Sequence, residues 1–278
     1  MDLSNRVVVV TGGGSGIGEA LAVAAKEAGA THVVVADLNG DEAQRVAGDI
    51  GGTGVEIDVR DEAAIIDLVN RTETDHGPIG LFASNAGYVT IGGIEDTNER
   101  IQAMWEVHVM SHMYAARAVL PQMIANGSGY LLNTASAAGL LTQLGSMAYS
   151  VTKGAAVSLA EYLSVSHHHQ GIRVSVLCPQ AVETNILANS PDQELRAELD
   201  LDGGVASGDG VISTDEVAAL CLEAMAEERF WVLPHPEVAE YARRKATDVD
   251  RWLGGMRRFQ GALYGDGPLP GDAIAPTI

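Results

Sequence analysis

Short apolar runs alternate with longer segments of helical periodicity through about the first two thirds of this chain. The runs are rich in β-branched residues and apolar on both faces, as in the strands of a covered parallel sheet. They are Val7 to Val10, Val33 to Ala36, Val55 to Ile57, Leu81 to Ser84, Tyr130 to Asn133 and Val174 to Leu177. The helical segments are Gly16 to Ala28, Asp41 to Ala47, Asp61 to Asp75, Arg100 to Ala125 and Met147 to His169. This alternation predicts an α/β protein whose doubly wound parallel sheet carries helices on both faces.

The length of 278 residues suits one such domain, residues 1–278, and no linker divides the chain. Two segments depart from the alternation. Residues 183–212 read as a helical and then Gly- and Asp-rich stretch, and residues 254–278 form a tail rich in Gly and Pro. We expect the first segment to cover a substrate, and the tail is a second candidate for covering a ligand.

The composition opposes several classes of function. The chain has 17 basic and 37 acidic residues, a net charge of −20, which disfavours binding to nucleic acid and to anionic membranes. Its two cysteines, Cys178 and Cys221, lie among apolar residues, which fits a reducing compartment. No uninterrupted apolar run approaches the ~18 residues of a membrane span. We therefore expect a cytoplasmic protein that acts on a small molecule.

A glycine-rich segment, Thr11 to Gly18, joins the first predicted strand to the first helix. Glycines there allow backbone amides to approach a pyrophosphate, and the helix N-terminus adds positive potential. Asp37 follows the second strand, where a carboxylate accepts hydrogen bonds from both adenosine ribose hydroxyls and repels a 2′-phosphate. Neither Gly13, Gly14 nor Leu38 offers a basic side chain to such a phosphate. The pattern favours NAD over NADP; the alternatives are an ordinary turn and a helix-capping aspartate.

A second chemical signal is Tyr149 with Lys153, four residues apart on one face of a predicted helix, and Ser136 thirteen residues before the tyrosine. A free phenol has a pKa near ~10, too high for an efficient base at neutral pH. An adjacent ammonium favours the phenolate, so we expect Lys153 to lower the pKa of Tyr149. The alternative is an ordinary pair on a helix surface.

These segments together resemble the short-chain dehydrogenase/reductase family. The similar motifs are the Thr-Gly-x-x-x-Gly-x-Gly loop at Thr11 to Gly18, the adenine-contacting pair at Asp58 and Val59, and the Asn-Ala-Gly motif at Asn85 to Gly87. The resemblance runs from Arg6 to about Thr184. It implies a Rossmann fold and an NAD-dependent oxidoreductase that interconverts a secondary alcohol and its ketone by hydride transfer.

The resemblance also implies roles for individual residues. Ser136 would bind the substrate oxygen, Tyr149 would exchange the proton, and Lys153 would hydrogen-bond the nicotinamide ribose. Contacts to NAD⁺ or NADH are expected from Gly12, Ser15, Gly16, Ile17, Gly18, Asp37, Leu38, Asp58, Val59, Asn85, Ala86, Gly87, Tyr149, Lys153, Pro179, Val182 and Thr184. No metal site is predicted, because the consecutive helix positions of His167 to His169 point about 100° apart.

Two positions depart from the family pattern. His108 stands where many members have an asparagine that completes a water-mediated proton relay. Because imidazole titrates near neutrality, we expect His108 to serve the relay as a fourth catalytic residue with a different pH response; the alternative is a structural helix histidine. Gln180 stands where the family usually has glycine after Pro179. It either shapes substrate choice or points into solvent.

The expected substrate lining is mainly apolar. It comprises Tyr88, Ala138, Leu140, Met147, Gln180, Ile186 and Leu187, of which Ala138, Met147 and Gln180 are the candidate substrate contacts. No Arg or Lys stands at a matching position, so a hydrophobic secondary alcohol is expected. The resemblance further implies a homodimer or homotetramer that packs the segments Arg100 to Ala125 and Met147 to His169. Two alternative functions remain: NAD-assisted epimerisation or dehydration, and a non-catalytic dinucleotide sensor.

Overall fold

The computed structural model describes residues 1–192 and 208–265, which build a parallel sheet of seven strands. The strands are β1 (Val7–Thr11), β2 (His32–Asp37), β3 (Thr53–Glu56), β4 (Ile79–Ser84), β5 (Gly129–Thr134), β6 (Ile172–Leu177) and β7 (Trp231–Val232). Their spatial order is β3-β2-β1-β4-β5-β6-β7. The order reverses between β1 and β4, and at such a switch point the connections diverge and leave a crevice at the carboxyl ends of the strands.

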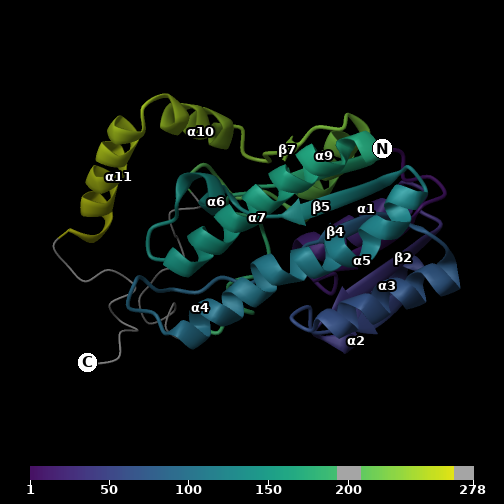
Figure 1. Cartoon of the computed structure of the whole chain (residues 1–278). Helices are drawn as coiled ribbons and strands as arrows, with labels where there is room; N and C mark the ends of the chain where they lie inside the picture. The colour runs from purple at the N-terminus through teal and green to yellow at the C-terminus, as the bar shows by residue number, and fades with distance from the viewer. Residues whose placement is uncertain (193–207, 266–278) are drawn as a thin grey trace.

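Helices cover both faces of the sheet (Figure 1). They are α1 (Gly16–Glu27), α2 (Gly40–Ile50), α3 (Glu62–His76), α4 (Asn98–Trp105), α5 (Ser111–Ala125), α6 (Ala137–Leu141), α7 (Met147–His167), α9 (Thr214–Ala226), α10 (Glu237–Thr247) and α11 (Val249–Tyr264). Alternate strand residues feed two cores: Val7 and Val9 pack with residues of α3, α5 and α7, and Val8 and Val10 with residues of α1, α2 and α9. The expectation of a doubly wound sheet with helices on both faces is confirmed.

The structure differs from the expected helices in one internal detail. The segment expected to be helical from Arg100 to Ala125 begins at Asn98, where Thr97 caps it by accepting a hydrogen bond from the Arg100 amide at 3.3 Å. It is then interrupted by a π-helix, η1 (Glu106–Met110), which contains His108. Such a widened turn changes the direction in which the residues on it point.

The C-terminal third contains elements that the sequence patterns did not indicate, namely β7, α9, α10 and α11. Helix α11 runs through Gly254, where we expected the irregular tail to begin, because Asp248 caps it by accepting a hydrogen bond from the Arg251 amide at 3.0 Å. Part of each segment that we expected to be irregular lies outside the described residues: residues 193–207 of the segment 183–212, and residues 266–278 of the segment 254–278. None of the helices that are described is long and apolar enough to cross a membrane.

The turn before β6 requires a glycine. Gly171 has φ of +84°, and a Cβ there would lie 1.9 Å from the carbonyl oxygen of Gly127. Gly171→Ala should therefore lower the free energy of unfolding by about 2 kcal/mol or more. Gly48→Ala is the matched control: this exposed position in α2 has open space around it, and the change should stabilise by about 0.5–1 kcal/mol. Urea denaturation measures both, and an unchanged stability of Gly171→Ala would contradict the turn geometry.

Candidate active site

The glycine-rich loop lies at the switch point, between β1 and the N-terminus of α1. Gly12 has φ of +64°, and a Cβ there would lie 2.7 Å from the Ala86 Cα, so the loops after β1 and β4 approach each other closely only with glycine at this position. Ser15 is the N-cap of α1, and its side chain makes no capping hydrogen bond. The amides of Gly16, Ile17 and Gly18 begin the helix and have no acceptor within it. These donors and the helix dipole fit a pyrophosphate.

Asp37 lies at the end of β2 beside this loop. Its Oδ2 accepts a hydrogen bond from the Gly14 amide and its Oδ1 accepts one from the Asn39 amide, both at 2.9 Å. The carboxylate is therefore held in place before any ligand binds. Each oxygen keeps a lone pair for a further donor, such as a ribose hydroxyl.

The basic side chain of Arg45, which the sequence analysis did not single out, also contacts the glycine-rich loop. Arg45, on α2, donates to the Gly14 carbonyl at 3.3 Å. Its guanidinium is already paired with Glu19 at 3.0 Å and Glu42 at 2.8 Å. Two carboxylates therefore offset the charge of this guanidinium, and Leu38 adds no charge beside it.

A chain of hydrogen bonds connects the loop to helix α7. The Asn85 amide donates to Thr11 Oγ1 at 3.0 Å, and the Thr134 hydroxyl donates to Asn85 Oδ1 at 3.0 Å. The Lys153 Nζ then donates to the Thr134 carbonyl at 2.9 Å. The chain thus crosses β1, β4 and β5. Thr134 was not singled out from the sequence, where its one signal is its place at the end of a predicted strand.

Ser136, Tyr149 and Lys153 are all buried at the carboxyl edge of the sheet. Ser136 begins α6, where its Oγ accepts from the Ala138 amide at 3.1 Å. The Ser136 hydroxyl donates to the Pro179 carbonyl at 3.4 Å. Lys153 Nζ lies 5.7 Å from the centre of the Tyr149 ring. The structure therefore brings together Ser136, Tyr149 and Lys153, three of the four residues that the sequence predicted to be catalytic.

The electrostatics of this trio differ from the expectation. Burial raises the pKa of the Tyr149 phenol, and the nearby Ser136 hydroxyl offsets part of that rise. We expected the Lys153 ammonium to lower this pKa, but the ammonium is directed at the Thr134 carbonyl and burial has the larger effect. Burial also lowers the pKa of Lys153 to about 8.

His108 is fully buried, and its ring hydrogen bonds determine its protonation. Nε2 accepts from the Tyr88 amide at 3.2 Å, and Nδ1 lies 3.0 Å from Thr152 Oγ1. Since a backbone N–H can only donate, Nε2 carries no proton and the ring is neutral. Burial and the nearby Lys153 place its pKa well below the usual value, so the expected titration near neutrality is wrong. The ring instead ties η1 to the loop after β4 and to α7.

An apolar cluster surrounds the Tyr149 ring. Its buried members besides Tyr149 are Val89, Met104, Ala138 and Ala148, with Tyr88, Ile101, Ile186 and Leu187 packed against them. Four of the seven residues expected to line the substrate site thus gather at Tyr149. Leu140 packs against the larger core instead.

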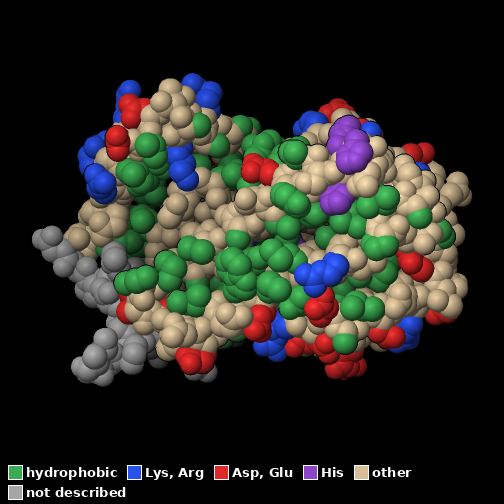
Figure 2. All heavy atoms as spheres, in the orientation of Figure 1, with side chains coloured by type: hydrophobic (Ala, Val, Ile, Leu, Met, Phe, Trp, Pro, Cys, Tyr) green, Lys and Arg blue, Asp and Glu red, His purple; other side chains and the backbone are tan. Residues whose placement is uncertain are grey.

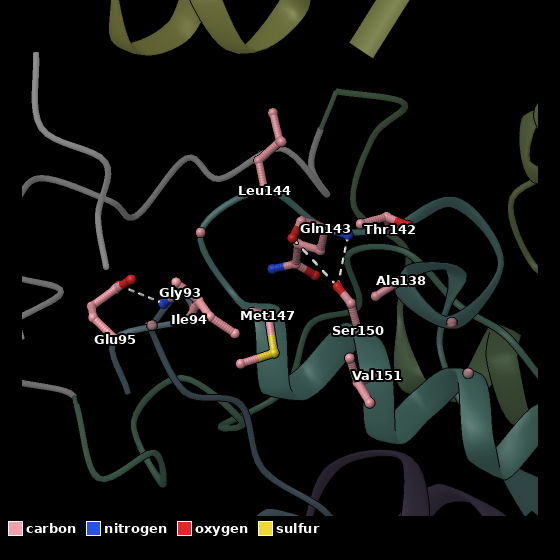
Figure 3. Close-up of a pocket in the computed structure, with 14 residues that line it drawn as sticks. Gly93, Ile94, Glu95, Ala138, Thr142, Gln143, Leu144, Met147, Ser150 and Val151 are labelled. Carbon is pink, nitrogen blue, oxygen red and sulfur yellow. Dashed lines mark hydrogen bonds between the residues drawn. The ribbon is translucent and has the colours of Figure 1, made fainter. Parts of the chain in front are cut away.

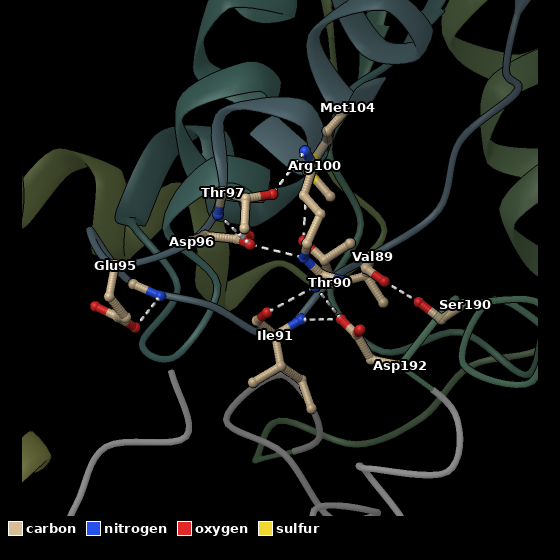
Figure 4. Close-up of polar contacts among 11 residues, drawn as sticks. Val89, Thr90, Ile91, Glu95, Asp96, Thr97, Arg100, Met104, Ser190 and Asp192 are labelled. Atoms are coloured by element: carbon tan, nitrogen blue, oxygen red, sulfur yellow. Dashed lines mark hydrogen bonds and ion pairs between the residues drawn. The ribbon is translucent and has the colours of Figure 1, made fainter. Parts of the chain in front are cut away.

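A largely buried ion-pair network holds the segment after β6 against the loop that precedes α4 (Figure 4). Asp192 Oδ2 accepts from the Ile91 amide and from Arg100 Nη2, both at 2.8 Å. Arg100 also pairs with Asp96 at 2.6 Å, and the Ser190 hydroxyl donates to the Val89 carbonyl. The described part of the expected covering segment is therefore attached to the loop that precedes α4.

The other two candidate substrate contacts lie elsewhere. Met147 lines a cavity of about 490 Å³ beside the first turns of α7, which Ala138 also lines but Tyr149 and Ser136 do not (Figure 3). The Gln180 side-chain oxygen is buried, and it has no hydrogen-bond partner in the part of the chain described. Gln180 therefore does not direct this oxygen into solvent.

The remaining expected cofactor contacts also follow carboxyl ends of strands. They are Asp58 and Val59 after β3, Ala86 and Gly87 after β4, and Pro179, Val182 and Thr184 after β6. Asp58 is engaged by the Arg60 guanidinium at 2.6 Å, which lowers the pKa of that carboxyl. The Thr184 methyl faces Gly16, where a Cβ would lie 3.2 Å from it. The structure thus places the loop after β6 against the start of α1.

Comparisons with known proteins agree with this geometry. A family model described as short chain dehydrogenase matches residues 6–195. The chain is 33% identical to 1-deoxy-11-beta-hydroxypentalenate dehydrogenase of Streptomyces exfoliatus over 260 residues. This alignment covers 90% of each of the two chains. It is 32% identical over 200 residues to meso-2,3-butanediol dehydrogenase of Serratia marcescens, covering 70% of this chain and 78% of the other. A short chain dehydrogenase/reductase of Burkholderia phymatum, solved in complex with NAD, has a TM-score of 0.81 and 29% identity over 90% of this chain and 96% of its own.

A buried histidine next to this site makes stability depend on pH. His112 follows η1 in α5, and burial lowers its pKa from 6.5 to about 3. Below pH 6.5 the His112 imidazole binds a proton in the unfolded chain but not in the folded protein. The free energy of unfolding therefore decreases as the pH falls below 6.5. In His112→Leu, about one fewer proton is taken up on unfolding. The slope of the unfolding free energy against pH should therefore be smaller by ~1.4 kcal/mol per pH unit between about pH 6 and pH 4.

Urea denaturation across this pH range measures the slope. The matched control is His169→Gln, at an exposed position, which should leave the slope unchanged. An equal slope in His112→Leu and the wild type would show that His112 does not resist protonation.

Proposed function

This chain belongs to the short-chain dehydrogenase family of oxidoreductases, and from that premise we propose that it interconverts an apolar secondary alcohol and its ketone with NAD⁺ or NADH. The observation that carries the proposal is the buried trio Ser136, Tyr149 and Lys153, joined to the glycine-rich loop through Thr134 and Asn85. A protein that merely sensed the dinucleotide would have no use for a buried phenol beside a hydroxyl and an ammonium.

The residues of the trio divide the chemistry. In oxidation, Ser136 Oγ holds the alcohol oxygen and Tyr149 removes its proton. Lys153, held at the Thr134 carbonyl, binds the nicotinamide ribose. When bound, NAD⁺ supplies the acceptor for the hydride of the carbinol carbon. In reduction, Tyr149 returns the proton to the oxygen. His108 contributes by positioning the loop after β4 and helix α7.

The preference for NAD is supported by Asp37. Its carboxylate is fixed beside the loop and accepts the adenosine ribose hydroxyls, and the Arg45 charge nearby is offset by Glu19 and Glu42. A structural relative that binds NAD supports the same cofactor. The other residues we assign to cofactor binding are those that follow the carboxyl ends of β1 to β4 and β6.

The nature of the substrate is supported by the apolar cluster around Tyr149, which offers a substrate hydrophobic contact in place of a cation. Two relatives are named as dehydrogenases of hydroxylated compounds, which supports an alcohol. Ala138, Met147 and Gln180 remain our candidates for substrate contact.

Assembly into a homodimer or homotetramer is supported by exposed apolar side chains on α7. Val151, Tyr162 and Val165 are 54%, 66% and 83% exposed. Figure 2 shows hydrophobic side chains gathered over α5 and α7, the two helices that we propose to pack between subunits. The buried free thiols of Cys178 and Cys221 support a cytoplasmic location.

The chemistry is tested by NADH absorbance over a panel of secondary alcohols that includes 1-phenylethanol and cyclohexanol. The wild type should turn over at least one of them. Tyr149→Phe should lower kcat by about 10²- to 10⁴-fold because the proton acceptor is lost, and Ser136→Ala by about 10²- to 10³-fold. Tyr162→Phe, at an exposed position on the same helix, is the control and should keep full activity. Full turnover by Tyr149→Phe would refute the mechanism.

The cofactor assignment predicts a kcat/KM for NAD⁺ that exceeds that for NADP⁺ by about 10²-fold or more. The reason is that the half-buried Asp37 carboxylate repels the 2′-phosphate of NADP⁺ by a few kcal/mol. Asp37→Asn should reduce this ratio at least tenfold, ~1.4 kcal/mol. Asp41→Asn, an exposed change on α2, should leave the ratio as it is. A wild-type preference for NADP⁺ would show that Asp37 does not have this role.

A further inference from the structure

The peptide group between Pro179 and Gln180 links the reaction centre to a residue outside the matched family segment. Its carbonyl, that of Pro179, accepts hydrogen bonds from the Ala137 amide at 2.9 Å and the Ser136 hydroxyl at 3.4 Å. Its N–H, that of Gln180, donates to His235 Nδ1 at 3.2 Å. Because a peptide group is planar, fixing the direction of the N–H also fixes the direction of the carbonyl.

His235 follows β7, the strand next to β6, so it stands beside the loop that carries this peptide. The two strands are in register, with Leu177 opposite Val232, and the Cys178 amide donates to the Val232 carbonyl at 2.9 Å. His235 itself is 2% exposed. The sheet therefore supplies a rigid base from which the ring reaches the Gln180 amide.

The hydrogen bond determines which ring nitrogen of His235 is the acceptor. Since the Gln180 N–H can only donate, Nδ1 accepts and the ring N–H is on Nε2. That Nε2 is buried, with no hydrogen-bond partner among the described residues. A buried polar ring with an unpaired nitrogen is less favourable than an apolar ring of similar size. The interaction that a phenylalanine could not replace is the hydrogen bond from Gln180.

We propose that His235 is a positioning residue for the reaction: it holds the Pro179–Gln180 peptide so that the Pro179 carbonyl fixes the position of Ser136 Oγ at the place proposed for the substrate oxygen. The inference rests on the proposed function, in which Ser136 holds that oxygen. His235 touches neither substrate nor cofactor in this role, and its effect on the rate passes through Ser136.

The test compares His235→Phe, which keeps the aromatic volume and loses the acceptor, with His235→Asn, whose Oδ1 takes the place of Nδ1. His235→Phe should lower kcat by about ten- to a hundredfold, as expected for a small misplacement of a catalytic group, with the KM for the alcohol nearly unchanged. His235→Asn should restore most of the rate. Equal rates for the two variants would overturn the proposal.

A double-mutant cycle separates positioning from a general loss of folding. If His235 acts through Ser136, His235→Phe should cause little further loss in a Ser136→Ala background. An equal loss in both backgrounds would overturn the proposal.

Hydrogen–deuterium exchange of the Gln180 amide reads the bond without catalysis. Exchange should be faster in His235→Phe than in the wild type and in His235→Asn; unchanged exchange would overturn the proposal. A wild type that turns over no alcohol would instead be a failure of the proposed function, because the exchange measurement would still report whether His235 holds the peptide.

Discussion

The hydrogen bond from the Lys153 ammonium to the Thr134 carbonyl is the contact on which the geometry of the site depends. A buried ammonium without an acceptor would be strongly unfavourable, so the position of Lys153 on the end of β5 is closely restricted. Tyr149 lies one helical turn earlier on α7, and its position relative to the sheet follows from that of Lys153. The Thr134 side chain bonds Asn85, and Asn85 bonds Thr11, so the proposed cofactor loop and the proton-transferring phenol share one scaffold.

Burial sets the electrostatic character of this scaffold. It raises the pKa of Tyr149, lowers that of Lys153 to about 8 and keeps His108 neutral. The nearby Ser136 hydroxyl opposes the effect of burial on the pKa of Tyr149, so the residue proposed to hold the substrate oxygen also influences the residue proposed to move the proton. The position of Ser136 therefore affects both the binding of the substrate oxygen and the proton transfer. The Pro179–Gln180 peptide, whose carbonyl contacts Ser136, influences both through it.

Much of this was predictable from the sequence where a local pattern had a single physical cause. The first six strands were located because Val, Leu and Ile runs apolar on both faces fit a sheet covered on both sides. Strand β7 was missed because it has two residues, too few for any periodicity. His108 was misjudged because its environment, the Tyr88 amide and Lys153, is created by the π-helix and not by neighbours in sequence. Thr134 accepts from Lys153 through its backbone carbonyl, and His235 accepts from the backbone amide of Gln180; contacts to backbone groups of distant segments leave no local sequence pattern.

In the proposed reaction, hydride leaves the substrate and is kept by the cofactor, which distinguishes an alcohol dehydrogenase from an enzyme that uses NAD for epimerisation or dehydration with the same residues. The most direct measurement is mass spectrometry of the products formed from NAD⁺ and a substrate alcohol deuterated at its carbinol carbon. For a dehydrogenase, we expect that the deuterium appears in NADH and that the ketone product carries none. Deuterium retained in the organic product, with NAD⁺ recovered unchanged, would contradict the proposed reaction.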